Sequence, residues 1–221
     1  MKDYSVKVVK VSDIKEWLLK KHYAHRIPSI SFAFGLYSLN VLVGVCTYGV
    51  PASPSLVQGV FGGLYKDIIY ELNRLVTNDN LPRNTLSFFV AQTFKLLPKP
   101  LAIVSYSDTS MHHHGYIYQA CNFVYTGLSS AHKEYRIEGT NNKHSRHLFD
   151  DFGGINKMKE CGVKMDIGQR ARKHRYFYFI GNKRQKKQML KKLQYHVLPY
   201  PKGDNTRYDS SYMPTVQLML F

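Results

Sequence analysis

The chain has 221 residues, which is enough for one substantial hydrophobic core or for a core with an appendage. Its 31 lysines and arginines outnumber its 15 acidic residues and give a formal net charge of +16, so we expect a polyanionic partner, nucleic acid above all. No segment approaches the ~18 uninterrupted apolar residues of a membrane helix, and the N-terminus has no apolar signal core. We therefore expect a cytoplasmic protein with no membrane partner.

Apolar periodicity predicts strands and helices over the first 130 residues. Two apolar runs separated by the short turn at 39–40 are typical of an antiparallel hairpin. The predicted order is a strand at 4–11, a helix at 12–26, strands at 30–38 and 41–50, a loop at 51–63, a strand at 68–76, a helix at 85–97, a strand at 101–108, a short helix at 113–122 and a strand at 123–129. Because strands and helices alternate after the hairpin, we expect a mixed α/β sheet with helices on both faces.

The composition changes from about residue 131. Between residues 167 and 203 there are eleven lysines or arginines and no acidic residue. This stretch predicts a strand at 174–181 and a basic helix that begins at residue 183 and stops before Pro199. The charge is compatible with a solvated helix face, but its interleaving with histidine and tyrosine rings favours a nucleic-acid surface. The expected nucleic-acid contacts are Arg170, Arg172, Lys173, Arg175, Lys183, Arg184, Lys186 and Lys187.

The order of elements resembles the GNAT acyltransferase fold, and GYIYQACNFVYTG (115–127) matches the last helix and strand of that fold. More specifically, the chain resembles the phage Mom family of DNA adenine-modification proteins. The stretches that carry this resemblance are KKHYAHRIPSISFAFGLY (20–37), TYGVPASPS (47–55), ELNRL (71–75), LPRNTLSFFV (81–90), VSYSDT (104–109) and QMLKKLQYHVLPYPKG (188–203).

The resemblance implies a GNAT-like mixed central sheet flanked by helices, with a basic C-terminal extension. It divides the chain into a catalytic core at 1–130, a basic region at 131–203 that completes the core and binds nucleic acid, and a tail at 204–221. It also implies an enzyme that converts adenine in phage DNA to a carbamoylmethyl derivative on the exocyclic amine, which protects the DNA from host restriction.

In a GNAT-like sheet two central parallel strands diverge around the carbonyl of the donor, and here these would be the strands at 68–76 and 101–108. Strand alternation predicts Glu71 and Asn73 on one face and Arg74 on the other, and it separates Ser107 from Asp108. Asp108 ends its strand, where open α/β sheets place ligands. Its carboxylate has two interpretations: it accepts the proton of the adenine amine, or it caps the following helix.

His22 and Tyr23 end the predicted first helix, which borders the acceptor pocket in GNAT domains. A tyrosine there can contact a nucleobase, and a histidine can accept a proton near neutral pH. The alternative is that the two side chains lie at an exposed helix end and only interact favourably with the helix dipole. The candidate catalytic residues are Asp108, His22, Tyr23, Ser107 and Glu71, and the candidate substrate contacts are Asn73, Arg74, Ser53, His114 and Tyr118. The loop around Ser53 is expected to close over the site.

Three consecutive histidines, His112, His113 and His114, suggest a metal. Side chains of neighbours on a helix point about 100° apart, so three neighbours do not readily share one ion. The plainer interpretation is the start of a helix, with His114 best placed to touch a ligand. Metal involvement has been suggested for Mom-like proteins, with ligands such as His22 and Asp108, but the spacing does not predict a metal site.

The donor is expected to be an acyl compound. Acetyl-coenzyme A is the weaker candidate, because the phosphate-binding place of GNAT domains here reads NDNLPRNTLS (78–87), which has no glycine. Arg83, Asn84 and Thr85 remain candidates to hold a phosphate or sugar. A glycyl ester already contains the atoms of a carbamoylmethyl group, so glycyl-tRNA is favoured and the basic region would help to bind it.

Two other functions remain open. One is a coenzyme A-dependent N-acyltransferase that acts on a protein or a small amine. The other is a non-catalytic DNA-binding protein on a degenerate GNAT domain. The sequence fixes neither the DNA context that is recognised nor the oligomeric state.

Overall fold

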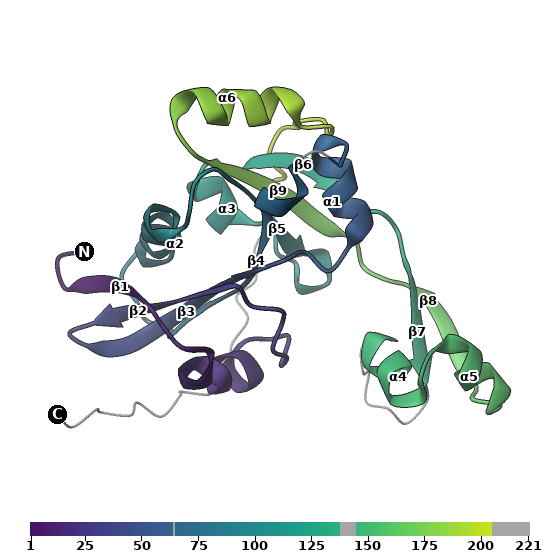
Figure 1. Cartoon of the computed structure of the whole chain (residues 1–221). Coiled ribbons are helices and arrows are strands. Elements are labelled where there is room, and N and C mark those ends of the chain that lie inside the picture. The colour runs from purple at the N-terminus through teal and green to yellow at the C-terminus, as the bar shows by residue number, and fades with distance from the viewer. Residues whose placement is uncertain (64, 138–144, 205–221) are drawn as a thin grey trace.

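A seven-stranded mixed sheet forms the centre of the molecule in a computed structural model, which describes residues 1–63, 65–137 and 145–204 (Figure 1). In spatial order its strands are β1 (Tyr4–Val8), β2 (Phe32–Ser38), β3 (Val41–Gly49), β4 (Ile69–Thr77), β5 (Leu101–Asp108), β9 (Lys173–Ile180) and β6 (Val124–Leu128). The pair β4–β5 is parallel and the other neighbouring strands are antiparallel. The predicted mixed α/β sheet is therefore confirmed.

The hairpin of β2 and β3 turns at the predicted residues. Leu39 and Asn40 have φ values of 47° and 70°, which are the positive angles of a two-residue turn that matches the twist of its strands. Asn40 adopts such angles readily, whereas Leu39 is unusual there and is exposed.

Helices cover the two faces of the sheet (Figure 1). On one face, α2 (Thr85–Leu96) and α3 (Tyr116–Ala120) bury Phe89, Phe94 and Tyr118 against the sheet. On the other face, α1 (Pro54–Phe61) buries Val60, and the N-terminal helical segment buries Trp17. We call these the α2 face and the α1 face. Helices on both faces are as predicted.

Strand β9 comes late in the sequence but lies inside the sheet, between β5 and β6. The basic helix α6 (Lys183–Lys192) follows it and packs Met189 against Phe177 and Phe179. Asn182 and Gln185 form a capping box at its start. The helix ends well before Pro199, so the predicted basic helix is too long; Leu193 already has an extended backbone.

Between β6 and β9 the chain forms an arm that projects away from the sheet (Figure 1). It consists of the antiparallel strands β7 (Lys133–Ile137) and β8 (Met165–Gln169) and the helices α4 (Ser145–Phe152) and α5 (Ile155–Glu160). Tyr135 packs against Phe149 with ring centroids 5.4 Å apart. The sequence analysis assigned no elements to this stretch. Of the predicted tail at 204–221, all but residue 204 lies outside the described residues.

Two predicted elements differ from the structure. The helix at 12–26 is a 3-10 turn (Val11–Ile14) and a π-helical turn (Trp17–Lys21), after which His22 is extended. This irregular winding buries Ile14, Trp17 and Leu18 together. The loop at 51–63 contains α1, because Ser53 caps the helix by accepting a hydrogen bond from the Leu56 N–H and Pro54 fits its first turn.

Within the described residues, the helices are too short or too polar to cross a membrane. The three cysteines are free, and they range from buried Cys46 to exposed Cys161.

Candidate functional site at the parting of two strands

The parallel strands β4 and β5 pair over only three residues and then part. Their last paired residues are Glu71 and Val104, although β4 continues to Thr77 and β5 to Asp108. The Ser105 hydroxyl donates a hydrogen bond of 3.0 Å to the Leu72 carbonyl at the start of the gap. A gap between diverging parallel strands is what the resemblance to GNAT domains implies.

A β-bulge at Asn73 decides which side chains share a face. Tyr48 of β3 pairs with Leu72, but the next residue back, Thr47, pairs with Arg74, so Asn73 is the extra residue. Glu71 and Arg74 therefore both point to the α1 face, opposite buried Leu72. The alternation that placed Glu71 and Arg74 on opposite faces is wrong, because it assumed an unbroken strand.

Glu71 lies at the point of parting. Its burial raises the pKa of the carboxyl, and the positive charges of Lys173, Arg74 and Arg26 offset part of that rise. Among the described residues, none forms a hydrogen bond or ion pair with this carboxylate. Its oxygens are therefore available to a ligand in the gap.

Asp108 is held differently, although it lies at the end of the neighbouring strand. One carboxylate oxygen accepts hydrogen bonds from the backbone N–H and the hydroxyl of Ser110, at 3.0 and 2.6 Å. The other is 2.8 Å from the amine of Lys173. Burial alone would raise the pKa of Asp108, yet the Lys173 ion pair and the Ser110 hydrogen bonds together hold it below its usual value. The capping interpretation of Asp108 is thus part of its role.

His22 and Tyr23 lie beside these charges. Their rings stack with centroids 4.5 Å apart, and the edge of Tyr23 meets the ring of His113 at 6.3 Å. Burial, followed by the nearby charges of Arg74, His25 and Lys173, lowers the pKa of His22 to about 3. Its Nδ1 accepts a hydrogen bond from the Ala24 N–H, so the neutral ring carries its proton on Nε2.

Tyr23 remains a phenol over the whole neutral range. Burial raises its pKa first, and the negative charges of Asp108 and Glu71 raise it further, against the effect of Arg74. With His22 neutral, the pair offers hydrogen-bond donors to a ligand and no formal charge. His22 is therefore a poor proton acceptor at neutral pH, although the sequence analysis considered it as a base.

Arg74 and Asn73 hold the chain that precedes β2. The guanidinium of Arg74 donates to the carbonyl of Arg26, and the amide of Asn73 donates to the carbonyl of Ser29 at 2.8 Å. The Asn73 oxygen accepts from Thr47. Both candidate substrate contacts thus position the segment that follows His22 and Tyr23.

Three predicted site residues belong to the α2 face instead. The Ser107 hydroxyl donates to the His113 carbonyl at 2.8 Å, and buried Tyr118 packs on the rings of Phe123 and Tyr176. His114 lies against His174, with ring centroids 5.6 Å apart. Because side chains alternate along β5, Ser107 points away from Asp108. Ser53 ends the short segment after β3 and caps α1, which occupies most of the predicted loop.

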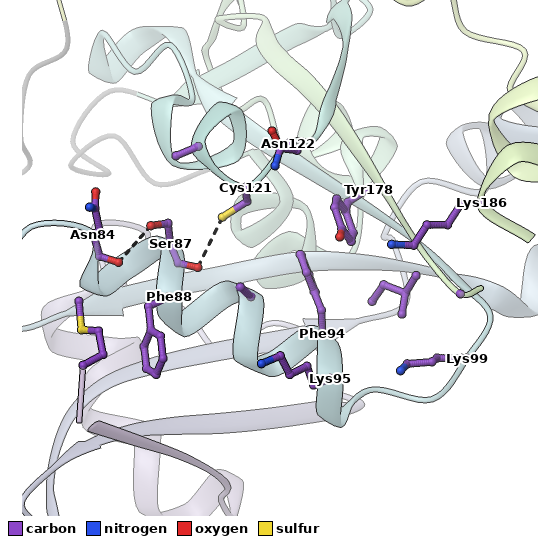
Figure 2. Close-up of a pocket in the computed structure, with 15 residues that line it drawn as sticks. Asn84, Ser87, Phe88, Phe94, Lys95, Lys99, Cys121, Asn122, Tyr178 and Lys186 are labelled. Carbon is purple, nitrogen blue, oxygen red and sulfur yellow. Dashed lines mark hydrogen bonds between the residues drawn. The ribbon is translucent and has the colours of Figure 1, made fainter. Parts of the chain in front are cut away.

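The candidate donor residues lie at the start of α2. Thr85 is buried and its hydroxyl donates to the Pro82 carbonyl, whereas Arg83 and Asn84 are exposed. Asn84 borders a groove of about 600 Å³ between α2 and α3 (Figure 2). This groove is on the α2 face, so the sheet separates it from Glu71.

The eight predicted nucleic-acid contacts divide into two groups. Lys183, Arg184, Lys186 and Lys187 are exposed on α6. The other four lie on or before β9, and three of them are engaged within the protein: Arg172 donates to the Ser129 carbonyl, Lys173 pairs with Asp108, and Arg175 donates to Thr126 and lies over the ring of Tyr195.

Lys173 is the site residue whose role sequence reasoning missed. It was expected to bind phosphate, but the register of β9 on β5 places it directly opposite Asp108. No local pattern reveals such a pairing between residues so far apart in sequence.

The three adjacent histidines do not converge. His112 has a left-handed backbone with φ of 52°, His113 meets Tyr23, and His114 packs on His174. Within the residues that the structure describes, no three histidine, cysteine or acidic side chains gather closely enough to hold a metal ion.

The sheet order and the polar cluster at the parting of β4 and β5 define a GNAT-like α/β protein. Solved structures similar to this chain include an acetyltransferase of the GNAT family from Bacillus cereus, with a TM-score of 0.42, 10% identity and coverage of 81% of this chain and 99% of that chain. Another is Arabidopsis thaliana NAA60 in complex with acetyl-CoA, with a TM-score of 0.48, 10% identity and coverage of 80% and 98%.

The particular family follows from the sequence match. The model of the Mom protein family matches residues 3–202, and the chain belongs to this family. It is 28% identical over 210 residues to the protein named methylcarbamoylase mom of Escherichia phage Mu, which covers 90% of this chain and 86% of that protein.

Proposed function

We propose that this protein is a transferase that modifies phage DNA, with the exocyclic amine of adenine as the acceptor and carbamoylmethyl-adenine as the product. Membership of the Mom family and the name of the phage Mu relative support DNA modification. The observation that carries the catalytic part is Glu71, a half-buried carboxylate with no hydrogen-bonding partner among the described residues, at the point where β4 and β5 part.

Glu71 is the general base in this proposal. The adenine amine is a weak nucleophile, so a carboxylate of raised pKa that removes its proton during attack on a carbonyl lowers the barrier. Asp108 has both oxygens engaged by Ser110 and Lys173, so it positions the rim of the gap. Two carboxylates with opposite environments thus take two roles.

His22 and Tyr23 complete the acceptor side. The Nε2 proton of His22 can orient a ring nitrogen of a purine, and the stacked ring of Tyr23 can contact the base, without adding charge beside Glu71. Arg74 keeps these two residues in place through the Arg26 carbonyl.

The donor in this proposal is glycyl-tRNA. The adenine nitrogen attacks the ester carbonyl, the ribose hydroxyl leaves with the proton, and adenine carries a glycyl group. The glycyl amine then attacks the ring carbon that bears the amide, and the bond from that carbon to the amide nitrogen breaks. The product, a carbamoylmethyl group on the amine, is an isomer of the glycyl adduct, so no oxidant and no second nitrogen donor is needed.

The test combines the purified protein and adenine-containing DNA with glycyl-tRNA, with uncharged tRNA plus glycine, or with acetyl-coenzyme A, followed by digestion and nucleoside mass measurement. We expect modified adenine with glycyl-tRNA alone, and resistance of the treated DNA to restriction enzymes that cut at adenine-containing sites. Modified adenine from acetyl-coenzyme A alone would overturn the glycyl donor. DNA binding without modification by any donor would favour the non-catalytic alternative.

A further inference from the structure

The groove between α2 and α3 has the lining of a nucleotide-binding surface (Figure 2). Phe94 and Tyr178 stack at its floor, with ring centroids 4.3 Å apart and an angle of 12° between the rings. The amine of Lys186 lies 5.3 Å from the centre of the Tyr178 ring. Polar groups of Ser87 and Asn122 line the same groove. An aromatic floor with a cation beside it suits an unpaired base and its phosphate.

Three lysines, Lys95, Lys99 and Lys186, border this groove from α2, from the loop after it and from α6 (Figure 2). All three are exposed. None of the described residues that line the groove is acidic, and none of these three amines forms an ion pair with a carboxylate of the described residues. We call these residues the lysine triad. Its charge is available to an anion.

The triad lies at the far end of the groove from Asn84. Lys95 is eleven residues further along the chain, which is about 16 Å of α-helix at ~1.5 Å per residue. A stacked strand places one phosphate every ~3.4 Å, so about five nucleotides span that distance. All phosphates of a coenzyme A molecule belong to one nucleotide, so its charge is confined to one part of the groove, whereas a polynucleotide strand carries phosphates along the whole length.

The groove and the Glu71 cluster lie on different faces of the sheet, and this indicates whether the groove binds the acceptor DNA or the donor RNA. Glu71, Asp108 and Lys173 gather on the α1 face, whereas the groove is on the α2 face. The two strands stop pairing after Glu71 and Val104, so this is the point of the sheet that lies between the two faces without a backbone ladder. An acceptor base next to Glu71 and a strand in the groove therefore approach from opposite sides. The strand in the groove is on the donor side.

We propose that the groove and the lysine triad bind the unpaired 3′ end of an RNA, whose terminal ribose carries the acyl ester toward the parting of β4 and β5. This inference rests on the proposed function, because that function supplies an RNA-borne donor. The triad holds phosphates upstream of the terminal nucleotide, and one unpaired base packs at the edge of the Tyr178 ring, whose faces meet Phe94 and Lys186. DNA is held elsewhere.

The experiment measures the affinity of the full chain for an uncharged glycine tRNA transcript at several salt concentrations. The variant Lys95→Glu/Lys99→Glu/Lys186→Glu should bind the transcript at least tenfold more weakly. Each single-strand phosphate contact contributes ~0.7 to the slope of log affinity against log salt, so loss of three contacts should lower the slope by about 2. Affinity for an adenine-containing DNA duplex should fall no more than it does in a control variant with the same change of net charge.

A matched control reverses three exposed lysines of the arm and its flank, Lys157→Glu/Lys159→Glu/Lys164→Glu, which changes the net charge equally. Equal loss of transcript affinity in both variants would overturn the inference, since it would reflect charge alone. So would a triad variant that loses as much DNA affinity as transcript affinity, or that binds coenzyme A less well but the transcript as before. Removal of the unpaired 3′ nucleotides from the transcript should abolish the difference between the wild-type chain and the triad variant.

The outcome is distinguishable from that of the proposed function. If the triad variant loses transcript affinity but glycyl-tRNA supports no modification, the groove binds RNA and the glycyl donor is wrong. If glycyl-tRNA supports modification and the triad variant retains both affinity and rate, the groove is not the donor site.

Discussion

Glu71 and Asp108 are two carboxylates of one polar cluster whose surroundings shift their pKa values in opposite directions. Burial raises the pKa of Glu71, which has no hydrogen-bonding partner among the described residues. Lys173 and Ser110 outweigh burial at Asp108 and lower its pKa. A carboxylate with a raised pKa accepts a proton more readily than one that is fully engaged, so the division of roles follows from these contacts.

Replacement of Glu71 tests this division directly. Glu71→Gln keeps the size of the side chain but removes the proton acceptor, so modification should fall by roughly 10²–10⁴ while the thermal midpoint changes little. With the wild-type chain, the rate should fall as the pH drops through the raised pKa of Glu71, because protonation blocks the base. Single-turnover modification rates across pH measure both effects.

The matched variant is Asp108→Asn, which retains an oxygen for Ser110 but loses the charge that pairs with Lys173. We expect a smaller loss of rate and the same acid limb in the pH profile. If Asp108→Asn removes the acid limb and Glu71→Gln retains it, the two roles are reversed.

His22 links stability to pH. Its pKa of about 3 in the folded chain lies below the ordinary 6.5, so the unfolded chain takes up the proton first as the pH falls. The stability that this neutral, buried ring contributes is complete above pH 6.5 and is lost progressively down to about pH 3. At pH 5 the loss is about 1.5 pKa units, or roughly 2 kcal/mol at ~1.4 kcal/mol per unit.

Denaturant unfolding at pH 7 and pH 5 measures this effect. His22→Gln should reduce the loss of stability between the two pH values by about 2 kcal/mol, because the variant has no group to protonate. His196→Gln removes an exposed histidine and should leave the loss unchanged. Identical pH dependence in all three chains would contradict a buried neutral His22.

At the residue scale the sequence identified part of the site. Asp108 and Tyr23 were chosen as polar residues at a strand end and a helix end, and Glu71 from the strand at 68–76; in the structure the charges of Asp108 and Glu71 raise the pKa of Tyr23. The assignment of faces failed at Asn73, because a bulge depends on pairing with β3 that periodicity does not contain. Lys173 was missed as a partner of Asp108 for a similar reason, since its register is long-range.

At the scale of elements, the buried strands were the most predictable parts. The strand at 101–108 has the same bounds in the structure, because its apolar run is buried on both faces. Helix α1 was missed because proline, serine and glycine are typical of loops, yet Ser53 and Pro54 are also favourable at a helix start. The arm was missed because its short elements alternate polar and apolar residues only weakly.

The arm is an insertion between β6 and β9 that has its own apolar contacts. Leu148 and Met158 are buried, and neither belongs to the clusters that pack on the central sheet. At its base, the Arg170 N–H donates to the His132 carbonyl at 2.9 Å, so the two chain ends of the arm are adjacent. The core sheet therefore has little need of the arm.

Excision of the arm tests its independence. We expect a chain in which Asn-Gly replaces residues 133–169 to fold, because a two-residue turn of this type joins antiparallel neighbours such as His132 and Arg170. Circular dichroism should show one cooperative thermal transition, within several degrees of the intact chain. A second chain with Pro-Pro in place of Asn-Gly cannot form that turn and should be less stable. An aggregated or non-cooperative Asn-Gly chain would show that β9 needs the arm in order to enter the sheet.

At the scale of the whole molecule, two polar surfaces of different character lie near opposite ends of strand β9. The α1 face carries a compact cluster in which Lys173 and Asp108 are paired, whereas the exposed cations of α6 and of the groove lie beyond the opposite end of β5. The strand β9 joins the two, since Lys173 begins it and α6 follows it. In the proposed function, acceptor chemistry and electrostatic attachment therefore occupy different places in one continuous fold.

The net charge of +16 predicts a salt dependence of DNA binding that does not follow from any single contact. If the excess charge binds phosphates, each contact with duplex DNA contributes ~0.9 to the slope of log affinity against log salt, and six contacts weaken binding by roughly 10³ between 50 and 200 mM salt. Titration of labelled duplexes with and without adenine should give the same steep slope, because phosphate contacts carry no base information. A slope near zero on both duplexes would mean that the charge is only a solvated surface, and that recognition of DNA depends on the few groups around Glu71.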